Sequence, residues 1–99
     1  MKPIFLSLKK QYFLEFKEGK SSVEYRRKGW WTADKFPVGN KIILGCGYSG
    51  ERLSATIAQC YEISSSSIQG NDGVAVREIY GPGVTCLAIH LADIKLLTA

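Results

Sequence analysis

The order of the predicted helices and strands limits the fold more than any other feature of the sequence. An apolar run over residues 3–8 predicts a strand, and an apolar face over residues 10–18 predicts a helix. Gly19 suits the left-handed conformation that ends a helix, and the alternation over residues 22–26 predicts a second strand. Because one helix is too few to cover both faces of a parallel sheet, a doubly wound α/β fold is excluded.

The remainder of the chain is rich in β-prone residues. A serine run at 64–67, followed by residues 69–73, predicts an exposed loop, while residues 74–80 suit either a short helix or a bent strand. Strands are predicted over residues 41–44, 53–63 and 84–91, the last continuing over 93–97 after a bend. We therefore predict a predominantly β, α+β fold: a small, mostly antiparallel barrel with one N-terminal helix and room for a second short one.

The charge of the chain is unevenly distributed. The 99 residues, which we expect to form one domain over 1–99, carry a net charge of +4. Residues 1–50 hold ten of the thirteen Lys and Arg but only four of the nine acids. Such asymmetry attracts polyanions such as RNA, although ordinary solubility charge explains it equally well.

The composition also bears on the compartment and on cofactors. No apolar run approaches the ~20 residues of a membrane span, and Lys9 and Lys10 interrupt the apolar start too early for a secretory signal. Three scattered cysteines are typical of buried free thiols, and with one histidine they are too few for a zinc site. We expect a cytoplasmic monomer without a membrane partner, metal or cofactor.

Four polar residues of the second predicted strand share one face. Lys20, Ser22, Glu24 and Arg26 recur at period two and are expected to point outward. The two cations suit a phosphate or carboxylate, and Glu24 suits either an ion pair with Arg26 or a hydrogen bond from a base. The alternative is a solvated row of charges with weak ion pairs, worth ~0–1 kcal/mol.

Aromatic residues in two loops are further candidates for ligand contact. Trp30 and Trp31 follow a basic run, a combination typical of single-stranded nucleic-acid binding, although one tryptophan is expected to plug the barrel. Tyr48 lies in Gly45–Gly50, which matches the dinucleotide fingerprint literally but lacks the following helix, so we interpret it as a turn.

Nearly the whole sequence resembles the ASCH domain, and the Gly19–Arg26 block is the specific part of the resemblance. The similarity rests on Leu6-Ser7-Leu8-Lys9, a helix with Tyr12 and Phe16, and Gly19-Lys20-x-x-Val23-Glu24-Tyr25-Arg26; the ending Ala88–Ile94 is similar to the closing strand of that family. ASCH domains are small β-barrels similar to the PUA RNA-binding domain. The resemblance implies a cleft beside the Gly19–Arg26 block that binds RNA or a nucleotide.

The residues that the resemblance assigns to this cleft are Lys9, Lys20, Glu24 and Arg26. From the loop aromatics we expect Tyr48 and one of the tryptophans, Trp30, at its rim. Some family members look like amidohydrolases of N4-acetylcytidine that use a lysine and a threonine where this chain has Ser21 and Glu24, which favours binding over that activity. Two alternatives remain: an enzyme acting on RNA or modified nucleosides with Lys20 and Glu24 as acid–base groups, and a protein-interaction adaptor.

Overall fold

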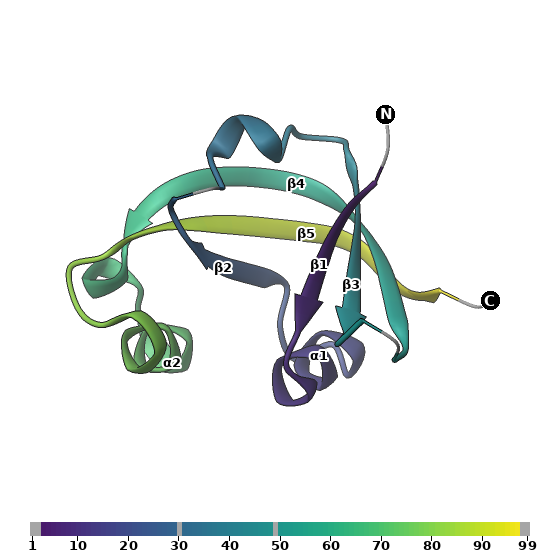
Figure 1. Cartoon of the computed structure of the whole chain (residues 1–99), viewed down its shortest axis with the longest axis horizontal. Helices are drawn as coiled ribbons and strands as arrows, with labels where there is room; N and C mark the ends of the chain where they lie inside the picture. Colours follow the sequence, from purple (N-terminus) through teal and green to yellow (C-terminus); the bar gives the residue numbers. More distant parts are fainter. Residues whose placement is uncertain (1–2, 30, 49, 98–99) are drawn as a thin grey trace.

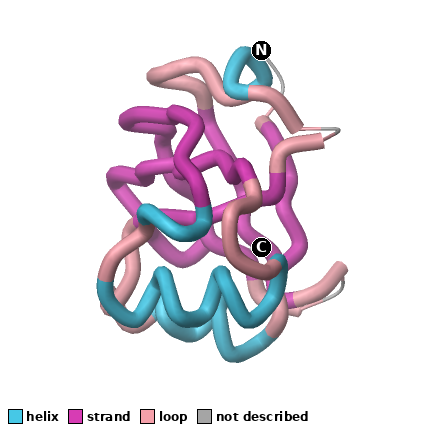
Figure 2. Tube along the Cα trace, turned by 90° about the vertical axis from the view of Figure 1, so that its left-hand side faces the viewer, coloured by secondary structure: helices cyan, strands magenta, loops and turns pink. Residues whose placement is uncertain are grey.

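The computed structural model describes residues 3–29, 31–48 and 50–97 and consists mainly of strands. Its two helices lie below a strongly curled sheet, one on either side of β2 (Figure 1). Figure 2, turned by 90°, shows both helices again at one end of the molecule. In chain order the elements are β1 (Ile4–Leu8), α1 (Lys10–Lys17), β2 (Val23–Arg27), η1 (Ala33–Lys35), β3 (Lys41–Cys46), β4 (Arg52–Ser64), η2 (Ser65–Ser67), α2 (Gly70–Tyr80) and β5 (Thr85–Leu97).

The five strands form one sheet in the order β1-β3-β4-β5-β2, so β1 and β2 are its two edges. Of the four strand pairs in the described part of the chain, the β1–β3 pair is parallel and the other three are antiparallel. The long strands β4 and β5 shift register near Thr56, where Asp93 takes a left-handed φ of 53°. Such a bulge bends a strand pair and increases its twist, which brings the two edges toward each other. The predicted β-rich, curled-barrel fold is confirmed.

Two apolar clusters hold the helices against the sheet. Phe13 and Phe16 of α1 are buried in the main core, which fills the concave side of the sheet together with residues such as Leu44 and Ile89. A smaller cluster under α2 contains Val76, Ile68, which follows η2, and Cys86 of β5. Among the described residues, no helix is long and apolar enough to cross a membrane.

Two sequence predictions are wrong in the region before β5. The serine run forms the 3-10 helix η2, and Ser65 is fully buried instead of lying in an exposed loop. The segment 69–73 is not a loop either, because α2 already begins at Gly70. Buried hydrogen bonds explain the first error: the Ser65 hydroxyl donates to the Gly81 carbonyl at 2.7 Å and accepts from the Val84 N–H at 3.0 Å.

Candidate functional site

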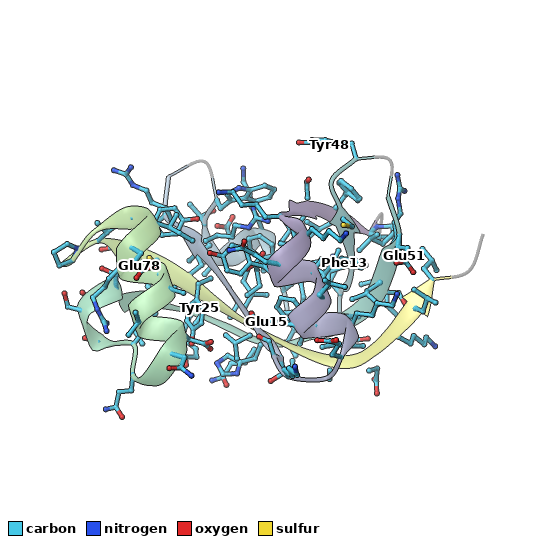
Figure 3. All side chains as sticks on the ribbon, turned by 90° about the horizontal axis from the view of Figure 1, so that it is seen from below. Phe13, Glu15, Tyr25, Tyr48, Glu51 and Glu78 are labelled. Carbon is cyan, nitrogen blue, oxygen red and sulfur yellow. The ribbon has the colours of Figure 1, made fainter. Side chains whose placement is uncertain are left out.

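A cleft of about 240 Å³ lies between α1 and α2, with β2 between its two walls. Figure 3, seen from below, shows Glu15 and Tyr25 in the space between the two helices. The lining combines apolar, aromatic, hydroxyl and charged side chains and comprises Ser7, Leu8, Lys9, Tyr12, Glu15, Phe16, Ser21, Val23, Glu24, Tyr25, Arg26, Asp72, Ala75, Val76, Ile79 and Tyr80.

Helical periodicity explains how each wall is built. The α1 wall contains Tyr12, Glu15 and Phe16, which are three and four residues apart and therefore share one helix face. The α2 wall follows the same rule. Its first lining residue is Asp72, and the other four, of which Tyr80 is the last, lie three, four, seven and eight positions after it. Each helix thus presents one side to the cleft.

Arg26 connects the two edges of the sheet at the base of the cleft. Its Nη2 donates to the Ser7 carbonyl of β1 at 2.9 Å, and to Oε2 of Glu24 at 3.1 Å. Its Nε also donates to the same Glu24 oxygen at 3.3 Å. The Nη1 group makes no hydrogen bond to the described residues. Every buried side-chain nitrogen or oxygen among those residues has a partner, so the unbonded Nη1 is not buried. Arg26 therefore retains donors for a ligand.

The predicted outward orientation of Glu24 and Arg26 is wrong. Glu24 lies opposite Ile89 and Arg26 opposite Leu87 in the antiparallel β2–β5 pair. Opposite residues in such a pair share a face, and both partners are fully buried, so the Glu24–Arg26 pair faces the concave side of the sheet. The ion pair is accordingly sheltered, with side-chain exposures of 12% and 22%.

Burial sets the proton affinity of Glu24. Removal from water raises the pKa of this carboxyl above its ordinary value of 4.5, while the Arg26 charge, the hydrogen bonds from Arg26 and the Tyr25 N–H at 3.1 Å act in the opposite direction. Burial also raises the pKa of Tyr25, assisted by the nearby Asp72 and Tyr61. A carboxyl of this kind in a cleft is typical of a functional site.

The cleft is mixed in charge. Its described lining contains two cations, Lys9 and Arg26, and three carboxylates, Glu15, Glu24 and Asp72. The Arg26 charge is already balanced by Glu24. The cationic character expected around the Gly19–Arg26 block thus does not extend to this lining. No three His, Cys, Asp or Glu side chains gather in a possible metal site in the part of the chain that the structure describes.

The structure brings together three of the residues singled out in the sequence. Lys9, Glu24 and Arg26 line the cleft. Lys20 does not: its side chain is 72% exposed and lies 3.5 Å from the Glu18 carboxylate, so the suggested acid–base pair of Lys20 and Glu24 is not assembled.

Tyr48, one of the two residues predicted at the rim, does not line the cleft. Tyr48 is 80% exposed and packs beside Phe5 with ring centroids 5.9 Å apart. Figure 3 shows Tyr48 beyond α1, away from Tyr25. Trp30 lies outside the described residues. Its neighbour Trp31 is partly buried against the core, with its ring 5.3 Å from Phe36.

Sequence reasoning missed the aromatic and α2 components of the cleft. Tyr12 and Tyr25 line the cleft, although neither is among the residues predicted to contact a ligand. The α2 face, including Asp72 and Tyr80, was hidden because its first turn was interpreted as a loop. The periodic spacing of Val76, Ile79 and Tyr80 is the one sequence signal that points to this wall.

A comparison with solved structures finds a protein whose fold is similar to that of this chain. A crystal structure of a serine-to-alanine mutant of ZmASCH from Zymomonas mobilis superposes with a TM-score of 0.70, covering 93% of this chain and 68% of that one. The chain has the fold of an ASCH domain. Sequence identity over this match is 14%, so the similarity concerns the fold alone. No family model matches the sequence, and no curated protein matches it.

Proposed function

We propose that the protein binds RNA and holds one nucleotide of it in the cleft between α1 and α2. The observation that carries this proposal is the set of groups around the cleft: the free Nη1 group of Arg26, and the side chains of Lys9, Tyr12, Tyr25 and Tyr80. Its ASCH-like fold adds support, since ASCH domains are similar to the PUA RNA-binding domain.

The size and chemistry of the cleft suit a single base. Its volume of about 240 Å³ lies below the ~300–1,000 Å³ of pockets for drug-sized ligands. Proteins recognise unpaired RNA bases by stacking them on aromatic rings and by hydrogen bonds to their edges. Here the tyrosines supply rings and hydroxyls, and the Nη1 group of Arg26 supplies N–H donors for a base acceptor or a phosphate oxygen, since Nε and Nη2 already donate to Glu24 and Ser7.

Binding of short single-stranded RNA, measured by fluorescence anisotropy, tests the proposal. Arg26→Lys keeps the positive charge beside Glu24 but loses the planar set of donors, so we expect an affinity loss of about tenfold or more. Lys9→Ala is expected to weaken binding several-fold, while Lys10→Ala, an adjacent exposed lysine outside the cleft lining, leaves it nearly unchanged.

Two outcomes would contradict RNA binding at this site. If wild-type protein binds no RNA, the adaptor hypothesis gains support. If Lys9→Ala and Lys10→Ala weaken binding equally and Arg26→Lys has no effect, the RNA binds elsewhere.

Hydrolysis of RNA or of a modified nucleoside is a second candidate function. It is favoured by Glu24, a buried carboxyl with a raised pKa beside the cleft, because such groups serve as general acids or bases. The prediction is product formation from RNA or acylated cytidine that Glu24→Gln abolishes. Purified wild-type protein that yields no product after prolonged incubation would count against it.

A further inference from the structure

Two aromatic side chains on β4 and β5 form a fixed pair on the sheet. The Tyr61 hydroxyl and Nε2 of His90 are hydrogen-bonded at 3.0 Å, and the two rings are stacked with centroids 5.3 Å apart and planes inclined by 30°. Tyr61 is nevertheless 38% exposed, and His90 is partly exposed. The hydrogen bond fixes the Tyr61 ring, so little rotamer freedom is lost when a second ring packs on it.

Neither Tyr61 nor His90 lines the cleft, but the register of the sheet relates them to two residues that do, Val23 and Tyr25. Ala88 of β5 lies opposite both Tyr25 of β2 and Tyr61 of β4, and His90 lies opposite Val23. Opposite residues share a face, so Tyr25, Tyr61 and His90 lie on one surface of the sheet. With neighbouring strands ~4.8 Å apart, the backbones of Tyr25 and Tyr61 are separated by about 10 Å. The raised pKa of Tyr25, to which Tyr61 contributes, agrees with this proximity.

An exposed cation lies at the same end of β2. Lys20 precedes Val23 by three residues, so it is at most ~10 Å away along the chain, and Val23 lies opposite His90. The Lys20 side chain is 72% exposed, and its ion-pair partner Glu18, at 3.5 Å, is 53% exposed. It is thus available to a phosphate that passes this end of the strand.

We infer that Tyr61 and His90 form a second base-stacking site, and that the ligand is therefore single-stranded RNA of more than one nucleotide, not a free mononucleotide. One base occupies the cleft, another stacks on the exposed side of Tyr61, and Lys20 contacts the connecting backbone. This inference rests on the proposed RNA binding in the cleft. Stacking on aromatic side chains tolerates any base, so this second site adds affinity without sequence preference.

Parallel measurements of short single-stranded RNA oligomers and of the four nucleoside 5′-monophosphates test the inference. Tyr61→Ala is expected to lower oligomer affinity about tenfold and to leave mononucleotide affinity unchanged. Tyr61→Phe keeps the ring and is expected to retain most of the oligomer affinity. Tyr48→Ala is the matched control, because it removes an exposed tyrosine that lies away from the cleft.

The outcomes separate this inference from the proposed function. If Tyr61→Ala binds oligomers as tightly as Tyr48→Ala does, while Arg26→Lys loses both ligands, the second site is refuted and the cleft stands. If wild-type protein binds neither ligand, both are refuted. Thermal unfolding verifies that each variant is folded. Should Tyr61→Ala unfold, His90→Ala replaces it, since loss of the stacked partner is expected to weaken oligomer binding several-fold and to spare mononucleotides.

Discussion

Arg26 has a structural role as well as its proposed binding role. The edges β1 and β2 are not joined by a described backbone ladder, and the Arg26 guanidinium bridges them by donating to the Ser7 carbonyl. The same guanidinium neutralises Glu24, whose burial would otherwise be costly. The Arg26 side chain therefore links the two edges of the sheet beside the cleft.

This bridge leads to a prediction about stability. Arg26→Lys is expected to lower the free energy of unfolding by about 1.5–3 kcal/mol, because hydrogen bonds from a charged group to Ser7 and Glu24 are lost. Arg52→Lys is the control: Arg52 is exposed, lies 4.9 Å above the Phe5 ring and bridges no strand edges. Urea denaturation of both variants measures the difference, and equal losses would contradict a bridging role for Arg26.

Glu24 gives a prediction about pH. Since the folded protein binds the Glu24 proton more tightly than the unfolded chain, its contribution to stability is complete below about pH 4.5 and falls as the pH rises through the raised pKa. The free energy of unfolding of the wild type minus that of Glu24→Gln should therefore decrease with rising pH. Urea denaturation from about pH 4 to about pH 8 tests this, and a difference that grows with pH would contradict the argument.

Partly buried side-chain hydrogen bonds connect α2 to the segments before and after it. Ser65 contacts the Gly81 carbonyl and the Val84 N–H, and Nη1 of Arg77 donates to the carbonyls of Ser65 and Ile68 at 2.8 and 2.9 Å. These bonds fix both ends of α2, which forms one wall of the cleft.

Removing the Ser65 hydroxyl is expected to loosen this wall. Ser65→Ala leaves a partly buried N–H and a partly buried carbonyl without that partner, so we expect a loss of about 1–3 kcal/mol and faster hydrogen exchange in α2. Ser67→Ala, at an exposed serine of the same turn, should change stability by less than about 0.5 kcal/mol. Indistinguishable unfolding of the two variants would show that Ser65 does not fasten α2.

The two helices also illustrate what the sequence alone predicts. The prediction for α1 is accurate because its signals are local: an apolar face, and Gly19, which adopts the expected positive φ of 75°. The start of α2 contains Gly70 and Gly73, which disfavour a helix in isolation. Packing explains the glycine at position 73, because a Cβ there would lie 1.9 Å from the Ile68 carbonyl oxygen.

At the scale of the whole molecule, the curl of the sheet brings β1, β2 and both helices around one cleft. Alternation in the sequence correctly groups Glu24 with Arg26, but the direction of that face depends on pairing with Leu87 and Ile89, far along the chain. Lys20 precedes β2, so the strand period does not extend to it. The position of Tyr48 depends on the β3–β4 connection, which no local pattern places relative to the cleft.

The distribution of charge over the molecule predicts a modest salt dependence. Each phosphate neutralised on single-stranded RNA contributes about −0.7 to the slope of log K against log salt concentration. We expect Lys9→Ala and Lys20→Ala each to reduce the magnitude of the slope by about 0.7, while Lys35→Ala, an exposed lysine of η1 outside the cleft lining, leaves it unchanged. Equal slopes for all three variants would contradict the proposed backbone contacts.

The central claim, that the cleft between α1 and α2 receives RNA, is tested most directly by a two-dimensional amide NMR titration with short single-stranded RNA. We predict saturable shifts concentrated at Lys9, Tyr12, residues 23–26 and residues 72–80, with a smaller set around Tyr61. Shifts centred on Tyr48 and Arg52, or no saturable shifts at all, would contradict it.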